Sequence, residues 1–241
     1  MRSPHIFCLL ALFTVILPSY AQIKGSNQIP NFNRMPGGYA FNESNIDPYI
    51  KSVTEPIGMI GSPYLFEKAI PSKIVFADTS RDTIELNLNY NLYVDFMKIE
   101  DENNPSDKIE LLPRGWNYDI LMGERRFRFI SFSHGDKEVN AHVEILDTYE
   151  DGSFLALQRI KTIKEGLLGV KDRFVDTEYY YYIRTDGSSL ELQNDYESVL
   201  NGIPEQFKTE IKNFIAANNI RFEENLRGLK GVIRYYAQNS Y

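Results

Sequence analysis

The sequence predicts a mainly β protein of the α+β class, in which an antiparallel meander of about eight strands precedes a pair of C-terminal helices. From Ile84 to Phe96 every second side chain is apolar, which is typical of a strand with one buried face. Further short β-type runs follow at close spacing and are joined by turn residues, without a helical crossover. After Ser188 the apolar period becomes helical, so the helices follow the sheet.

Residues 1–21 have the three-part layout of a bacterial secretory signal. Arg2 supplies the charge, Ile6–Leu17 is an unbroken apolar run, and Ser19–Ala21 places small residues at both ends of the cleavage motif. The run has about 12 residues, fewer than the roughly 20 that a spanning helix needs. We therefore expect a signal peptide that is cleaved before Gln22.

Cleavage removes Cys8, the single cysteine, and leaves 220 of 241 residues without a thiol. Cys8 lies in the middle of the apolar run and not at the cleavage point, so we expect no lipid anchor. Loss of Arg2 takes the formal net charge from −7 to −8, which argues against nucleic acid or anionic lipid as the main partner. We expect export through the inner membrane to the periplasm or to an association with the outer membrane, with no transmembrane span.

Residues 22–62 are polar and rich in turn residues, which predicts a leader or linker before the β domain. The alternative is a leader that ties onto the domain or a partner through aromatic side chains. These are Tyr39, Phe41, Tyr49 and Tyr64.

The β domain is predicted over residues 63–188. Asn89–Asn91, in the middle of the long alternating run, is typical of a bend that divides it into two strands. The meander must close into a barrel or fold into a sandwich to bury its apolar face, and both remain open. The other predicted strands are Lys73–Ala77, Lys108–Leu112, Asn117–Met122, Arg125–Phe132, Glu138–Leu146, Phe154–Lys164 and Arg173–Arg184.

Residues 189–241 are predicted to form two helices that pack on the β domain. Pro204 followed by an acidic residue is a typical helix start, and Asn218-Asn219 a typical end. A second helix is expected from about Glu223. Gly228 and Gly231 weaken it by roughly 1 kcal/mol each, unless close packing uses the missing side chains.

The order of these segments resembles a family of secreted proteins of unknown function from Bacteroidota, over about Gly61 to Tyr241. The resemblance rests on Gly61-Ser62-Pro63-Tyr64-Leu65, on Leu88-Asn89-Tyr90-Asn91-Leu92, and on Phe214-Ile215 with Asn218-Asn219-Ile220-Arg221-Phe222 before Tyr235-Tyr236. These motifs are structural: the start of a strand, a bend and a helix cap. The resemblance implies an envelope protein and supplies no catalytic residue.

The mature chain keeps two histidines, and the strand parity of His142 and the turn position of His134 predict that both face solvent. Nucleophile elbows, zinc-binding histidine motifs and phosphate-binding glycine loops are absent from the sequence. We therefore predict no catalytic residue, no metal ligand and no cofactor.

Acidic and aromatic residues supply the candidate binding surface. Asp172, Asp176 and Glu178 alternate with Tyr180 and Tyr182 on one strand face, an arrangement that suits a sugar or peptide and equally the wet face of a sheet. The aromatic residues either anchor an interface or fill the core. Arginines such as Arg125, Arg126 and Arg128 are expected to form cross-strand ion pairs. The candidate binding residues are Trp116, Tyr118, Tyr180, Tyr182, Asp176 and Glu178.

Together these features favour an exported, non-catalytic accessory or binding protein of the bacterial cell envelope, whose β domain engages a protein partner or a small apolar ligand. One alternative is a periplasmic lipid or lipoprotein carrier. A third hypothesis, an envelope hydrolase with paired carboxylates, needs two acids about 5–10 Å apart in one cleft. The oligomeric state is left open.

Overall fold

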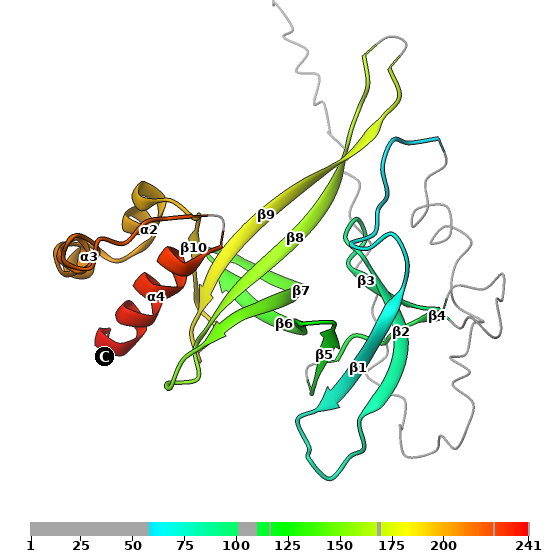
Figure 1. The fold of residues 1–241 in the computed structure, drawn as a ribbon, viewed down its shortest axis with the longest axis horizontal. Helices are drawn as coiled ribbons and strands as arrows, with labels where there is room; N and C mark the ends of the chain where they lie inside the picture. Colours follow the sequence, from blue (N-terminus) through cyan, green and yellow to red (C-terminus); the bar gives the residue numbers. More distant parts are fainter. Residues whose placement is uncertain (1–57, 101–109, 116, 168–169, 224, 241) are drawn as a thin grey trace, which may run out of the picture. The chain divides into compact units, whose positions relative to one another are not determined.

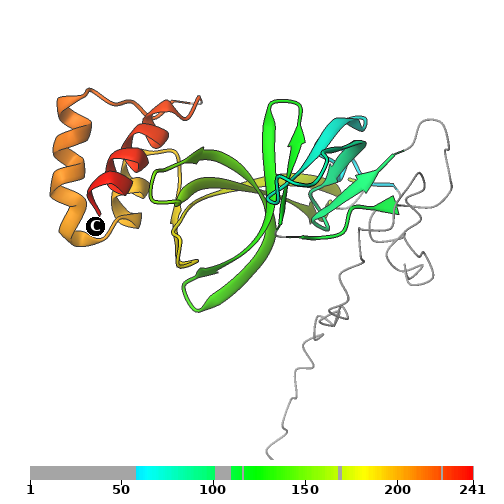
Figure 2. The same ribbon diagram turned by 90° about the horizontal axis from the view of Figure 1, so that it is seen from below.

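The computed structural model describes residues 58–100, 110–115, 117–167, 170–223 and 225–240. These residues form one antiparallel sheet of ten strands and three helices (Figures 1 and 2). The mainly β, α+β class is confirmed. The sheet is open, since its two edges are formed by different strands and do not pair with each other. The predicted signal peptide and most of the predicted leader, residues 1–57, lie outside the described residues.

Strands that are consecutive in the sequence are neighbours in the sheet, with one exception. Strand β5 does not pair with β4 but with β1, which therefore lies between β5 and β2. The sheet order is β10-β9-β8-β7-β6-β5-β1-β2-β3-β4. The strands are β1 (Ile70–Phe76), β2 (Ile84–Asn91), β3 (Phe96–Ile99), β4 (Glu110–Leu111), β5 (Tyr118–Met122), β6 (Arg125–His134), β7 (Lys137–Thr148), β8 (Phe154–Lys164), β9 (Arg173–Ile183) and β10 (Ser189–Leu192).

The helices number three in the described part of the chain, so the predicted pair was wrong. They are α2 (Tyr196–Gly202), α3 (Glu205–Ala217) and α4 (Arg227–Asn239). The additional helix, α2, has seven residues, which is too short for a helical period to stand out in the sequence. Its start follows the usual rule, because the side chain of Asp195 accepts a hydrogen bond from the backbone N–H of Ser198 at 2.9 Å.

The long alternating run is divided by a tight turn between β2 and β3, as the sequence predicts, although the division follows Asn91. The Asn91 side chain accepts a hydrogen bond from the backbone N–H of Tyr93 at 3.0 Å, and Asp95 has the left-handed φ of 57°. Asn91 pairs with Phe96, so the alternation restarts after the turn. Met97 is therefore fully buried and pairs with Tyr90. An unbroken alternation from Ile84 to Phe96 would instead put Met97 on the solvent-facing side of the sheet.

The core consists of three clusters. One lies among β1, β2, β3, β5 and β6 and includes Leu88, Met97 and Ile120. The second joins the three helices to the β8–β10 part of the sheet, through side chains such as Leu155 and Leu192. The third lies on the opposite face of β6–β9 and contains Phe132, Val143, Ala156, Tyr181 and Ile183. The helices thus cover one face of one end of the sheet (Figure 2).

The two glycines of α4 differ in their surroundings. A Cβ at Gly228 would overlap the carbonyl oxygen of Arg221, so the loop before the helix approaches it closely. Nothing lies within 4 Å of a Cβ at Gly231. Close packing therefore requires a residue without a side chain at position 228 but not at position 231.

The β8–β9 hairpin extends beyond its neighbour β7 (Figure 1). Strand β7 pairs with β8 over Phe154–Leu157 alone, whereas β9 pairs with the whole of β8. The remaining part, Gln158–Lys164 with Arg173–Tyr179, is a two-stranded ribbon that we call the outer ribbon. Two strands alone are marginally stable in water, so this ribbon needs support from elsewhere in the chain.

That support comes from residues 60–66, which we call the clasp. Ile60 pairs with Arg173 in β9, and the backbone N–H of Leu65 donates to the carbonyl oxygen of Tyr90 at 2.8 Å. The ammonium group of Lys161, whose side chain is 13% exposed, donates to the carbonyl oxygens of Ser62 at 2.7 Å and Tyr64 at 3.0 Å. The clasp thereby joins the end of β2 to the outer ribbon.

Candidate functional site

The predicted binding residues do not form one surface. Tyr118 is buried in the cluster around β1, β2 and β5, and its hydroxyl donates to the carbonyl oxygen of Pro113. Tyr182 is buried in the helix-covered cluster, with its ring edge-on to Tyr236 at 5.5 Å. The aromatic residues were expected either to anchor an interface or to fill the core, and these two side chains fill the core. Trp116 lies outside the described residues.

The other three predicted residues share one face of β9. The Tyr180 hydroxyl donates to Oε2 of Glu178 at 2.9 Å, and burial, followed by this contact, raises the pKa of Tyr180 to about 12. Glu178 also accepts a hydrogen bond from Nε of Arg159 at 2.8 Å. Asp176 is largely exposed, 3.6 Å from the ammonium group of Lys161. The acid–aromatic surface therefore exists, but arginine and lysine compensate its charges.

These contacts belong to a longer arginine–carboxylate row, which consists of Arg125, Glu144, Arg159 and Glu178 on four adjacent strands. Both Nε and Nη2 of Arg125 donate to Glu144, at 3.0 and 2.7 Å, and Arg159 donates to the same carboxylate from the other side. The expected cross-strand ion pairs are confirmed here. Each carboxylate is held by guanidinium groups, so the two acids do not face each other across an open cleft as the acids of a hydrolase do.

Arg126 and Arg128 form the same kind of contact on the opposite face of β6. Both guanidinium groups contact the carboxylate of Asp119, at 2.6 Å in each case. The Asp119 side chain is 14% exposed, so two cations neutralise one largely buried acid. The basic residues of this region are therefore internal partners of acids and not a separate basic patch.

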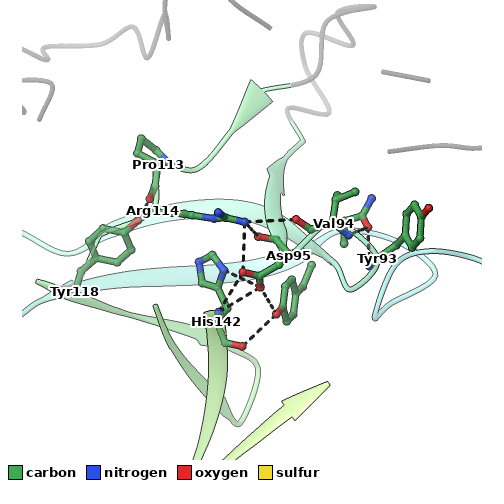
Figure 3. A network of polar contacts seen from close by, with 9 residues as sticks. Tyr93, Val94, Asp95, Pro113, Arg114, Tyr118 and His142 are labelled. Atoms are coloured by element: carbon green, nitrogen blue, oxygen red, sulfur yellow. Dashed lines mark hydrogen bonds and ion pairs between the residues drawn. The ribbon is translucent and has the colours of Figure 1, made fainter. Parts of the chain in front are cut away.

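His142 is 1% exposed, so the prediction that it faces solvent was wrong. It has the predicted strand parity, but the turn between β2 and β3 covers this face of β7. The Asp95 carboxylate accepts hydrogen bonds from the Tyr90 hydroxyl at 2.6 Å and from the His142 backbone N–H at 3.2 Å (Figure 3). The ring atom Nδ1 of His142 also lies 3.2 Å from Asp95. We call this group the Asp95–His142 centre.

Aromatic rings and one arginine enclose the centre. The His142 ring lies edge-on to Tyr90 at 5.7 Å and to Phe129 at 5.1 Å. The guanidinium of Arg114 donates to the Asp95 carbonyl oxygen at 2.9 Å (Figure 3), and it stacks over Phe96 at 4.6 Å. Burial, with the Asp95 charge as the next cause, raises the pKa of Tyr90 well above its ordinary value.

An aspartate that holds one ring nitrogen of a histidine also occurs in catalytic triads, so the other nitrogen decides what the centre can do. Nε2 of His142 is buried and has no partner among the described residues. Among these residues it therefore has no serine or threonine hydroxyl to activate. The contacts of the centre join the β2–β3 turn to β7.

His134 lies apart from this centre. Its Nε2 is 3.0 Å from a carboxylate oxygen of Glu191, and its side chain is 39% exposed. In the part of the chain that the structure describes, no group of three histidine or acidic side chains could hold a metal ion. The two histidines thus do not share a metal site within these residues.

Two of the most exposed apolar side chains of the described residues, Leu167 and Val170, lie where the β8–β9 hairpin turns back, and a third, Ile60, lies on the clasp, which pairs with β9 at Arg173. Leu167 is 86% exposed, Val170 61% and Ile60, on the adjoining clasp, 53%. The backbone N–H of Val170 donates to the carbonyl oxygen of Leu167 at 2.7 Å, and that of Gly166 donates to the carboxylate of Asp172 at 2.9 Å. A Cβ at Gly166 would overlap the carbonyl oxygen of Val170, so the turn is tight.

Three basic residues flank Leu167 and Val170 in the sequence. Lys164, Lys171 and Arg173 are all exposed. We call the apolar and basic side chains together the hairpin tip. The sequence predicts only a turn between the strands Phe154–Lys164 and Arg173–Arg184. The signal for a binding surface there is the presence of aliphatic residues where turn residues are usually polar.

Two surface pockets lie elsewhere. One, of about 250 Å³, is lined by β1 and β2 residues that include Lys73 and Glu85. The other, of about 510 Å³, lies between Tyr149, Asp151 and the end of α4. Charged side chains line both, which does not suit an acyl chain.

No known protein family, no curated protein and no solved structure matches this chain. None of the helices in the described ranges combines the length and the apolar character that crossing a membrane requires.

Proposed function

We propose that the protein is an exported, non-catalytic binding protein of the bacterial cell envelope, whose β domain engages a protein partner or an apolar ligand. One observation carries the proposal: Leu167 and Val170, the most exposed large apolar side chains of the described residues, lie together at the hairpin tip. Exposed apolar groups that cluster on an ordered element are typical of an interaction site.

The support of the outer ribbon strengthens this argument. Lys161 ties the ribbon to the clasp with two hydrogen bonds, and Tyr93 packs edge-on against Phe174 at 5.6 Å. These contacts fix the orientation of the hairpin as well as stabilising it. A binding element gains a fixed orientation, which lowers the entropy cost of association.

The contacts of the described carboxylates and histidines support a non-catalytic role. The arginine–carboxylate row occupies Glu144 and Glu178, and Asp95 holds His142 in a buried position. Export is proposed from the predicted signal in residues 1–21, and a lipid anchor is not proposed because Cys8 lies inside the apolar run.

The test uses the full chain expressed in a bacterium. We expect an N-terminus at Gln22 by mass spectrometry and saturable binding of the processed protein to isolated envelopes. The double variant Leu167→Asp with Val170→Asp should lose most of this binding. Tyr196→Asp, which changes another exposed apolar residue, should keep it, since Tyr196 is 38% exposed and lies on α2, away from the tip.

Three results would contradict the proposal. An unprocessed, cytoplasmic chain would remove the export step, and equal binding by the tip variant would remove the role of the tip. Turnover of an envelope glycan or ester by the purified protein would show an enzyme. Co-purifying lipid in native mass spectrometry would favour the carrier alternative.

A further inference from the structure

The outer ribbon has one cross-strand pair that conflicts with its neighbours. Arg159 lies opposite Glu178 and Lys161 opposite Asp176, so these two pairs join opposite charges. The last pair places Lys164 opposite Arg173, two like charges on facing strands. Such pairs are destabilising, and an anion that binds between them removes the repulsion.

Lys164, Lys171 and Arg173 are exposed and form no ion pair with any residue that the structure describes. The same turn contains two acids, Glu165 and Asp172, and the Asp172 carboxylate accepts a hydrogen bond from the Gly166 backbone N–H. Three cations against two acids leave this turn with a net positive charge in a chain whose formal net charge is −7.

The apolar residues of the tip narrow the kind of partner. Ile60, Leu167 and Val170 are aliphatic, whereas the anchors of protein interfaces are mostly tryptophan, tyrosine and arginine. The six side chains of the hairpin tip are also fewer than the roughly 20–30 residues on each side of a standard protein interface. A bilayer needs no complementary shape, and exposed aliphatic side chains flanked in the sequence by lysine and arginine suit its interface.

We infer that the hairpin tip binds the surface of an anionic phospholipid bilayer. Leu167, Val170 and Ile60 enter the boundary between headgroups and acyl chains, while Lys164, Lys171 and Arg173 contact the lipid phosphates. This inference rests on the proposed function and specifies the ligand of the same site. The overall negative charge opposes it weakly, because charges beyond ~8 Å are screened at physiological ionic strength.

The experiment measures partition of the chain from Gln22 onward into vesicles. This chain contains the compact unit Phe41–Tyr241, to which all described residues belong, and it lacks the apolar run of the predicted signal. The vesicles contain phosphatidylethanolamine and phosphatidylglycerol, with phosphatidylcholine vesicles as the uncharged comparison. Flotation through a density gradient gives the bound fraction.

We expect binding to the anionic vesicles that weakens with added salt and is much weaker on phosphatidylcholine. Lys164→Gln or Arg173→Gln should each lower the partition coefficient about fivefold, the effect of one cation near the surface. Leu167→Asp should lower it by more than about tenfold. Lys73→Gln, which changes an exposed lysine of β1, is the matched control and should leave partition unchanged.

A stability measurement separates binding from a structural role. Without vesicles, Lys164→Gln and Arg173→Gln should raise the urea midpoint slightly, because each removes the like-charge pair. Residues that merely support the ribbon would lower the midpoint when substituted. Loss of partition together with a lower midpoint in both variants would overturn the inference.

The remaining outcomes are also decisive. If the chain does not float with anionic vesicles, or if the Leu167→Asp variant floats equally well, the inference is wrong. Tip-dependent binding to envelopes that survives lipid extraction, with no vesicle binding, would identify a protein partner and leave the proposed function intact. If the chain binds vesicles but is not exported, the inference about the bilayer stands and the proposed function is wrong.

Discussion

Replacing Asp95 by alanine should unfold the Asp95–His142 centre and destabilise the whole sheet. The substitution removes the acceptor of four donors, which are the Tyr90 hydroxyl, the backbone and ring N–H groups of His142, and Nη2 of Arg114. The Arg114 guanidinium keeps the carbonyl oxygens of Val94 and Asp95 as acceptors. The Tyr90 hydroxyl has a second acceptor, the His142 carbonyl oxygen at 3.2 Å, so it keeps a partner. Both His142 donors remain buried without one.

The magnitude follows from these contacts. Each unsatisfied buried donor costs about 1–3 kcal/mol. Alanine at the left-handed φ of 57° adds roughly 1 kcal/mol, because its Cβ approaches the following carbonyl. We expect a loss of about 3–7 kcal/mol in the free energy of unfolding. For a chain of this length, this lowers Tm by about 15 °C.

The assay is urea unfolding followed by near-ultraviolet circular dichroism, with the urea dependence fitted together with the midpoint. Asp95→Asn is the matched control, since asparagine tolerates the left-handed backbone and keeps one acceptor oxygen, and it should lose about half as much. In the double variant with His142→Leu, the loss should be smaller than the sum of the single losses by about 1–2 kcal/mol. An Asp95→Ala variant within about 0.5 kcal/mol of the parent would refute the reasoning.

Two further predictions concern helix α4 and alkaline pH. Gly228→Ala should destabilise the protein by more than about 1 kcal/mol, because the new Cβ meets the Arg221 carbonyl oxygen. Gly231→Ala should stabilise it by up to ~1 kcal/mol, because nothing lies near the new Cβ and alanine favours the helix. Thermal unfolding of both variants distinguishes the two cases. Burial raises the pKa of Tyr90 and Tyr118 above the ordinary value of 10.0, so above about pH 10 the unfolded chain loses protons that the folded chain retains. Stability should be constant with respect to these groups below pH 10 and fall above it by up to about 1.4 kcal/mol per pH unit for each. Urea midpoints at rising pH should show the decline, and Tyr90→Phe should have a shallower one; equal slopes would contradict the assignment.

Local pattern was sufficient where neighbours in the chain decide the structure. The bounds of β8 agree with the predicted Phe154–Lys164, and α3 begins at Glu205 after Pro204 and ends before Asn218, as predicted. Periodicity and capping act within a few residues, so they are visible in the sequence. Strand β10 has four residues, too few for a period, and it was missed.

Long-range packing determined what could not be predicted. The face of His142 followed from its parity with Glu144, but its burial depends on Asp95, 47 residues earlier in the chain. Parity states which residues share a face and not what covers that face. The buried positions of Tyr118 and Tyr182 depend in the same way on where the sheet and helices pack.

The clasp has a consequence for the order of folding. Lys161 contacts carbonyl groups that are 99 and 97 residues away in sequence, so docking the clasp closes a loop of about 100 residues at an entropy cost of about 4 kcal/mol. Contacts of such separation form after local hairpins, and partial openings separate them first. We therefore expect the clasp and the outer ribbon to form one cooperative unit in native-state hydrogen exchange. Its amides should exchange together, before those of the strands beneath the helices, and each such opening should release the hairpin tip from its fixed orientation.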